Sequence, residues 1–181
     1  MNASVAVADF ASGARTFHVA GKIQASNVAR DMRLQRMLGH LTTLTTAHPG
    51  SVLVIGCGAG ITAGAKSIDP RVGREVIVEI ERLVPEAAGT YFTGPNFDVL
   101  HNPKVNLRIA GGRHYLMTAP ERFDGITVDP LDPGVKGAAN LYTEEFFQAM
   151  KRHLAPGRRN GVHPTLRKEP ARRQNVARHI L

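Results

Sequence analysis

The sequence has very little cysteine: Cys57 is the only one among 181 residues. A single thiol excludes an internal disulfide framework and any zinc or iron–sulfur site that needs several cysteines. The eight histidines stand singly between His18 and His179 and show no metal-ligand spacing. We therefore expect no metal cofactor.

Long hydrophobic runs are also missing. No stretch approaches the roughly 20 consecutive apolar residues of a membrane span. Residues 1–10 contain Asp9 and no Lys or Arg, so they lack the basic start of a secretory signal. With 43% hydrophobic and 21% charged residues, the composition falls in the ordinary globular range. We expect a cytoplasmic protein with one core and no membrane partner.

The net charge of +8 is unevenly distributed. Residues 156–181 hold six Arg and one Lys against a single Glu169, whereas residues 1–155 are close to neutral. A basic arm on nucleic acid is one interpretation, and it predicts salt-sensitive binding that disappears when 158–181 is deleted. Because the body of the chain is nearly neutral, nucleic acid is the weaker alternative as a partner.

The order of predicted elements is regular. The β-prone runs 4–7 and 16–23, separated by a turn at 11–13, predict a hairpin within residues 1–26. Hydrophobic periodicity then predicts helices and strands in alternation. Helices are expected at 27–45, 61–67, 82–92, 112–118 and 143–154, and strands at 51–55, 75–80, 105–109 and 123–128.

This alternation predicts the fold class. Strands alternating with helices at this spacing are typical of a doubly wound, mostly parallel α/β sheet, which binds ligands at the carboxyl ends of its strands. We expect an α/β domain at 27–157, preceded by the small β-hairpin element at 1–26. Residues 158–181 are expected to form a basic, irregular tail.

A glycine-rich turn follows the apolar run 51–55. Gly56, Gly58 and Gly60 leave no Cβ between the backbone and a nucleoside or phosphate lying across the turn. Ile61 stands where the dinucleotide fingerprint requires its third glycine. The spacing argues against NAD or FAD and favours the nucleoside-binding turn of the S-adenosylmethionine class, with a plain tight turn as the alternative.

Acidic residues follow two of the other predicted strands. Glu79 lies 19 residues beyond Gly60, where an acid can accept hydrogen bonds from both ribose hydroxyls. Asp129 and Asp132 follow the strand 123–128 and are suited to holding a cationic substrate or accepting a proton from an amine. The alternatives are solvated charges, a helix cap at Asp129 and a simple turn at Asp132.

Taken together, these segments resemble the spermidine synthase (polyamine aminopropyltransferase) family, which shares the S-adenosylmethionine-dependent methyltransferase fold. The similarity extends over residues 4–157. It rests on Gly21-Lys22-Ile23-Gln24, Met37-Leu38-Gly39-His40, the run 52–60, Val78-Glu79-Ile80-Glu81, Asp129-x-x-Asp132-Pro133 and Leu141-Tyr142-Thr143-Glu144-Glu145-Phe146-Phe147. The resemblance implies decarboxylated S-adenosylmethionine as the aminopropyl donor, a polyamine such as putrescine as the acceptor, and a homodimer.

The resemblance also implies a role for each site residue. The catalytic base falls on Asp129 and the ribose-binding acid on Glu79. The remaining donor-binding positions fall on Gly56, Gly58, Gly60, Gln24 and His40, and the acceptor-binding positions on Asp132 and Tyr142.

Three positions depart from the family pattern. Ala59 stands in the glycine-rich turn and Gly111 after the third strand, both where an acid is expected, and Leu34 replaces a substrate-contacting Tyr. A methyltransferase of the same fold that uses S-adenosylmethionine is therefore the alternative function. The tail also departs from the family, so we expect the C-terminal strands to be missing or altered, and a truncated, inactive chain is a further alternative.

Overall fold

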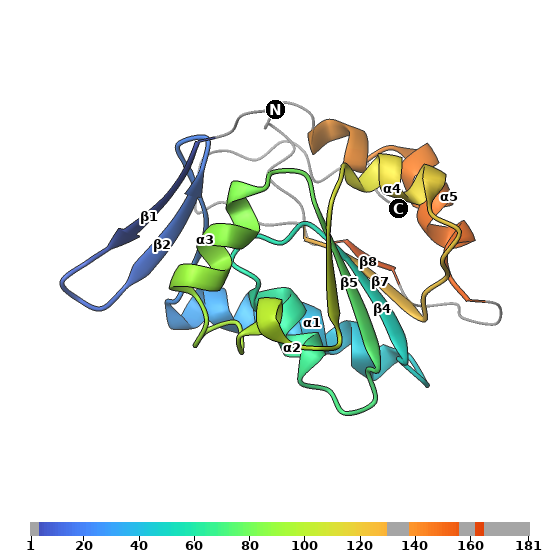
Figure 1. The fold of residues 1–181 in the computed structure, drawn as a ribbon, viewed down its shortest axis with the longest axis horizontal. Helices are drawn as coiled ribbons and strands as arrows, with labels where there is room; N and C mark the ends of the chain where they lie inside the picture. Colours follow the sequence, from blue (N-terminus) through green and yellow to red (C-terminus); the bar gives the residue numbers. More distant parts are fainter. Residues whose placement is uncertain (1–3, 130–137, 156–161, 165–181) are drawn as a thin grey trace.

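The computed structural model describes residues 4–129, 138–155 and 162–164. These residues form a small antiparallel sheet and a larger parallel sheet with helices on both faces (Figure 1). The doubly wound α/β fold expected from the sequence is confirmed.

The N-terminal sheet has three strands in the order β1-β2-β3: β1 (Val5–Asp9), β2 (Arg15–Val19) and β3 (Lys22–Ser26). The expected hairpin therefore gains a third strand. The second β-prone run is broken by a two-residue turn in which Ala20 and Gly21 have φ of 51° and 75°. Positive φ at both central residues is the geometry of a type I′ hairpin turn. Since alanine rarely adopts positive φ, a turn with Ala20 at its first central position is not expected from the sequence.

The larger sheet is entirely parallel and has the strand order β6-β5-β4-β7-β8. Its strands are β4 (Ser51–Ile55), β5 (Arg74–Glu79), β6 (Val105–Ile109), β7 (Gly125–Val128) and β8 (Val162–Pro164). Chain order reverses at the β4–β7 pair. In folds of this kind the crevice outside the carboxyl ends of the strands at such a reversal is the ligand site.

The helices lie close to the predicted ranges. They are α1 (Ala29–Thr45), α2 (Ile61–Ser67), α3 (Leu83–Tyr91), α4 (Gly112–Thr118) and α5 (Glu144–Arg152), with single 3₁₀ turns at η1 (Val99–His101) and η2 (Ala138–Leu141). Thr143 caps α5 by accepting a hydrogen bond from the Phe146 N–H at 3.3 Å. β7 is shorter than expected because Phe123 pairs with Leu154 in an isolated bridge instead.

The C-terminal segment 158–181 contains β8, which pairs in parallel with β7. The rest of that segment lies outside the described residues. Among the residues that are described, no helix combines the length and the apolar character required to cross a bilayer.

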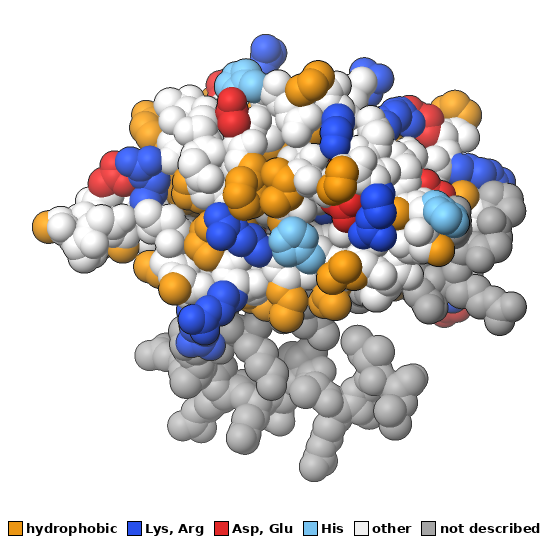
Figure 2. All heavy atoms as spheres, turned by 90° about the horizontal axis from the view of Figure 1, so that it is seen from below, with side chains coloured by type: hydrophobic (Ala, Val, Ile, Leu, Met, Phe, Trp, Pro, Cys, Tyr) orange, Lys and Arg blue, Asp and Glu red, His pale blue; other side chains and the backbone are white. Residues whose placement is uncertain are grey.

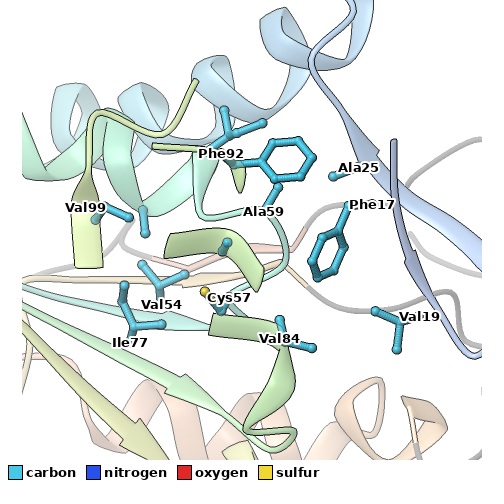
Figure 3. Close-up of a cluster of buried hydrophobic side chains, with 13 residues drawn as sticks. Phe17, Val19, Ala25, Val54, Cys57, Ala59, Ile77, Val84, Phe92 and Val99 are labelled. Atoms are coloured by element: carbon cyan, nitrogen blue, oxygen red, sulfur yellow. The ribbon is translucent and has the colours of Figure 1, made fainter. Parts of the chain in front are cut away.

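The core has two parts, one on each side of the parallel sheet. One cluster joins Val54 and Ile77 of the sheet with α2, α3 and the N-terminal sheet (Figure 3). There Phe17 of β2 meets Phe92 edge-on, with ring centroids 5.9 Å apart. The other cluster joins Leu53, Ile55, Val76, Val78, Ile126 and Val128 with α4 and α5. The strand alternation thus sends odd-numbered residues of β5 and β7 toward α2.

The outer side of α1 carries apolar side chains. Leu34, Met37, Leu41 and Leu44 are 36–71% exposed, whereas Leu38 and Thr42 on the inner side are buried. Figure 2 views the molecule from the side of α1 and α2 and shows several hydrophobic side chains on the surface, interspersed with Lys and Arg.

Candidate active site

The glycine-rich turn connects β4 to α2, and its three glycines have different surroundings. Gly56, Gly58 and Gly60 all have positive φ, at 93°, 52° and 77°. A Cβ on Gly56 would lie 2.3 Å from the carbonyl oxygen of Asp129, and one on Gly60 would lie 3.0 Å from Nδ2 of Asn96. A Cβ on Gly58 would meet nothing within 4 Å. Two glycines therefore permit close packing of the protein, and Gly58 borders open space where a ligand can approach the backbone.

Glu79, the last residue of β5, is tied directly to this turn. Its Oε2 accepts a hydrogen bond from the Cys57 N–H at 2.9 Å, and its Oε1 accepts from the N–H groups of Ile80 and Glu81 at 2.8 and 2.9 Å. The residue is 8% exposed, and burial raises the pKa of its carboxyl while the three backbone donors oppose that shift. The carboxylate thus lies beside the turn in a fixed orientation.

Asp129 follows β7 on the other side of β4. Its N–H donates to the Ile55 carbonyl at 2.8 Å, which extends the β4–β7 pairing, and its Oδ2 accepts a hydrogen bond from the Thr62 hydroxyl at 2.7 Å. Thr62 belongs to α2, the helix that begins directly after the glycine turn. The turn, Glu79 and Asp129 therefore meet at the carboxyl ends of three adjacent strands.

A second set of buried polar residues lies deeper in the same face of the sheet, below these residues. Lys66 of α2, Glu75 of β5 and Thr127 of β7 are all 0% exposed. Lys66 Nζ donates to Thr127 Oγ1, which lies 2.6 Å from the Thr42 hydroxyl. Burial lowers the pKa of Lys66 and raises that of Glu75, and each charge partly offsets the shift of the other. Sequence reasoning missed this set of residues.

The other predicted site residues fall on separate elements. Gln24 lies in β3 and His40 in α1, both half-buried, and within the described ranges neither side chain hydrogen-bonds to the turn, Glu79 or Asp129. Tyr142 directly follows η2. Leu141, the last residue of η2, has its Cδ2 atom 3.7 Å from the position that a Cβ on Gly112 would take. Because Gly112 also approaches Ile55, this segment lies over the carboxyl end of β4. Asp132 lies outside the described residues.

The departures from the family pattern have clear surroundings. Ala59 is 0% exposed and belongs to the buried cluster that contains Phe17 and Phe92 (Figure 3). Gly111 precedes α4, and a Cβ there would come no closer than 3.6 Å to Ile80. Leu34 lies on the outer side of α1. The Ala59 position therefore contributes apolar packing, whereas the Gly111 position has room for a side chain.

The arrangement can hold a nucleoside next to a carboxylate. A half-buried backbone that borders open space at Gly58, with an acid beside it, is a feature of nucleoside sites in doubly wound folds. A second acid, Asp129, follows the strand across the reversal. Within residues 4–129, 138–155 and 162–164 there is no group of three or more His, Cys, Asp or Glu that could hold a metal ion.

Comparisons with known proteins identify the family. The family model described as "Spermine/spermidine synthase domain" matches residues 31–181. The chain belongs to this family, and the resemblance read from the sequence is confirmed.

Individual relatives agree with this assignment. A polyamine aminopropyltransferase of Nitrosomonas europaea is 33% identical over 118 residues, which cover 65% of this chain. Polyamine aminopropyltransferase 2 of Hyperthermus butylicus is 31% identical over 152 residues, or 83% of this chain. The crystal structure of a spermidine synthase in complex with the transition-state analogue AdoDATO matches with a TM-score of 0.77 at 27% identity, covering 84% of this chain and 51% of that chain.

These matches cover only part of the relatives. The aligned region is 36% of the Nitrosomonas protein and 50% of the Hyperthermus protein. The chain therefore spans about a third to a half of the length of the curated relatives it matches.

Proposed function

We propose that this protein is an aminopropyltransferase that moves the aminopropyl group of decarboxylated S-adenosylmethionine to a polyamine such as putrescine. The observation that carries the proposal is the position of Asp129. Its main chain packs against Gly56, and its carboxylate is held by Thr62 at the start of the helix after the turn. The names of the relatives, polyamine aminopropyltransferase and spermidine synthase, support the same reaction.

The donor would lie across the glycine turn. Gly58 leaves its backbone open to a nucleoside, and Glu79 borders the same turn through its hydrogen bond from Cys57. A carboxylate oxygen has two lone pairs, so Oε2 of Glu79 can accept a ribose hydroxyl in addition to the Cys57 N–H. Gly58 and Glu79 thus fit the nucleoside part of the proposed donor.

Asp129 would act on the acceptor amine. It orients the attacking amine and accepts its proton, while the amine nitrogen forms a bond to the carbon next to the sulfonium. The carbon–sulfur bond breaks, its electron pair stays on sulfur, and methylthioadenosine leaves as a neutral thioether. Both substrates are cationic, so carboxylates at this edge of the sheet favour their approach.

Several further roles are part of this proposal. Gln24 and His40 are proposed to line the donor pocket, and Asp132 and Tyr142 to bind the acceptor. We also propose a cytoplasmic homodimer that requires no metal.

The donor test separates the proposed reaction from the alternative. Transfer to putrescine is measured with decarboxylated and with ordinary S-adenosylmethionine, and binding of both donors is measured by calorimetry. Aminopropyl transfer from the decarboxylated donor supports the proposal. Tighter binding of the carboxylated donor, with no transfer to putrescine, would favour a methyltransferase.

A matched pair of variants assigns the two acids. Asp129→Asn should keep methylthioadenosine binding and lower turnover by about 10²–10⁴-fold, the range for loss of a positioned base. Glu79→Gln should weaken methylthioadenosine binding by about 1–3 kcal/mol, because it removes the charged acceptor. Unchanged turnover in Asp129→Asn would overturn the mechanism.

One observation favours the methyltransferase alternative. The Ala59 position faces an apolar cluster, and Gly111 has no side chain, so two positions expected to be acidic supply no charge for a polycation. Nucleoside binding would survive both changes. Absence of transfer with every donor would instead indicate an inactive chain.

A further inference from the structure

Helix α2 contacts the end of β7 at two successive levels. Thr62 and Lys66 are four residues apart, so they lie one turn apart on the same side of the helix. Thr62 donates to the carboxylate of Asp129, and Lys66 donates to the hydroxyl of Thr127, two residues earlier in the strand. One turn of α2 therefore spans about the same length as two residues of β7, so Thr62 and Lys66 reach Asp129 and Thr127 in turn.

The hydrogen bonds below Asp129 have a defined direction. A lysine ammonium can only donate, so the Thr127 hydroxyl accepts from Lys66. Thr42 Oγ1 donates to the Leu38 carbonyl at 3.3 Å, which leaves Thr127 as the donor to Thr42. The charged form of Lys66 thus orders a chain of hydroxyls that joins α2, β7 and α1.

The second level also carries charge. Lys66 and Glu75 are both fully buried, and the two carboxylate oxygens of Glu75 have no hydrogen-bond partner among the described residues. The positive charge of Lys66 interacts with Glu75 and with Asp129. Burying an ammonium in a protein interior carries a penalty of several kcal/mol, so the fold alone gives no reason for this lysine.

The backbone of α2 is fixed where it presents Thr62. A Cβ on Gly39 of α1 would lie 2.4 Å from the Thr62 carbonyl oxygen, so the two helices approach closely at this residue. Thr62 is 1% exposed. Its hydroxyl is therefore held in place by the packing of α1 on α2.

We propose that Thr62 and Lys66 are positioning residues for Asp129. Thr62 fixes the orientation of the carboxylate, and Lys66 fixes the strand end below it and supplies a positive charge that favours the carboxylate over the acid. What Asp129 then does with an amine rests on the proposed function. The positioning itself does not depend on it.

Among the described residues, the titratable groups that interact in this part of the site come from several elements. Lys66 lies in α2, Glu75 and Glu79 in β5, Glu81 just after β5, Cys57 in the glycine turn and Lys104 just before β6. Burial raises the pKa of Cys57 well above its ordinary value, so this thiol stays neutral. Among these groups, Lys66 is the cation whose charge acts on Asp129, so its removal should raise the midpoint of the Asp129 titration.

The first test measures the titration of Asp129 directly, by carbon-13 NMR of its carboxyl group, with Asp129→Asn to assign the signal. Thr62→Val removes the hydroxyl at nearly constant shape and should move the midpoint upward by about one pH unit. Thr62→Ser keeps the hydroxyl and should restore the wild-type midpoint. A wild-type midpoint in Thr62→Val would overturn the role of Thr62.

The second test concerns Lys66. The double variant Lys66→Met/Glu75→Gln removes the buried ammonium, and its reference, Glu75→Gln, keeps the ammonium next to an amide that resembles the protonated acid. Compared with Glu75→Gln alone, the double variant should have a higher midpoint for Asp129, because only the cation differs between them. Equal midpoints in these two variants would overturn the role of Lys66.

A kinetic readout then separates this inference from the proposed function. With an active enzyme, Thr62→Val should lower kcat and leave methylthioadenosine binding unchanged, and Thr62→Ser should recover kcat. If the wild-type protein transfers no aminopropyl group, the proposed function fails while the NMR titrations still decide the positioning. If transfer is normal in all variants and the Asp129 midpoints are unshifted, Thr62 and Lys66 do not position Asp129, while the proposed function still holds.

Discussion

The two faces of the parallel sheet are built from different kinds of residue. The face covered by α4 and α5 is apolar, and its cluster contains Phe123, Phe146 and Met150, all at most 1% exposed. The face covered by α1 and α2 includes the buried polar residues Lys66 and Thr127. One face thus provides hydrophobic stabilisation, and the other carries the polar groups beneath the candidate site.

The difference follows from the alternation of the strands. Side chains two residues apart in a strand point to the same face. Asp129 at the strand end therefore has Thr127 below it, and Glu79 has Ile77 and then Glu75 below it. The face of the sheet that ends in Glu79 and Asp129 therefore also contains the buried polar residues Glu75 and Thr127.

Truncation on the apolar face should have the largest effect on stability. Phe146 is 1% exposed and packs edge-on against Phe147, with ring centroids 6.1 Å apart. Phe146→Ala should lower the free energy of unfolding by about 3–5 kcal/mol, because it removes buried apolar contacts and leaves a cavity. Urea denaturation measures the change, and Gln148→Ala on the exposed side of α5 is the control. A loss below about 1 kcal/mol would contradict the assignment of this face as the stabilising core.

On the polar face, stability should depend on pH through Glu75. Burial raises its pKa from 4.5 to about 8, so the folded protein keeps a proton that the unfolded chain loses between these values. Wild-type stability gains from this proton at low pH and loses that contribution as the pH rises. Glu75→Gln cannot titrate, so its free energy of unfolding relative to wild type should increase between pH 5 and pH 7, by on the order of 2 kcal/mol.

Urea denaturation at the two pH values checks this expectation. Glu144→Gln, on the exposed surface of α5, serves as the control because it makes the same chemical change without burial. Parallel stability curves for Glu75→Gln and wild type would show that Glu75 ionises normally. The polar face would then contain an acid whose pKa is not shifted by burial, and only the residue composition would distinguish the two faces.

The smallest effect is expected on the outer side of α1. Leu44 is 71% exposed, so Leu44→Gln should change the free energy of unfolding by no more than about 0.5 kcal/mol. Leu38→Gln, on the buried side of the same helix, is the matched comparison and should be clearly destabilising. Thermal unfolding and sedimentation measure both variants. A large loss in Leu44→Gln, or a change in its oligomeric state, would show that this side chain is covered in solution.

Much of the fold could be predicted because its signals are local. Apolar runs, turn glycines and helical periodicity gave the strands and helices to within a few residues. The same chain order placed Gly56, Glu79 and Asp129 at one edge of the sheet. The third N-terminal strand was missed because its turn puts Ala20 at positive φ, which its sequence does not signal.

The supporting residues of the site could not be predicted in the same way. The hydrogen bond from Thr62 joins residues 67 apart in the sequence, and that from Lys66 joins residues 61 apart. Such contacts depend on how α2 lies over β7. The one available signal was a lysine in a helix of otherwise small and apolar residues. The roles of all the predicted site residues stay predictions: Asp129, Glu79, Gly56, Gly58, Gly60, Gln24, His40, Asp132 and Tyr142.

The complete burial of α2 has a consequence for how fast this part of the molecule can move. All seven of its residues are buried, and Gly39 and Gly64 hold it within close contact of α1 and of the Asn96 backbone. Amide hydrogens in such a helix exchange with solvent only when a large part of the domain opens, so they should be among the slowest in the protein. We therefore expect α2 to keep its conformation when a ligand binds at the glycine turn. A slow conformational step in binding would then take place in other segments of the chain.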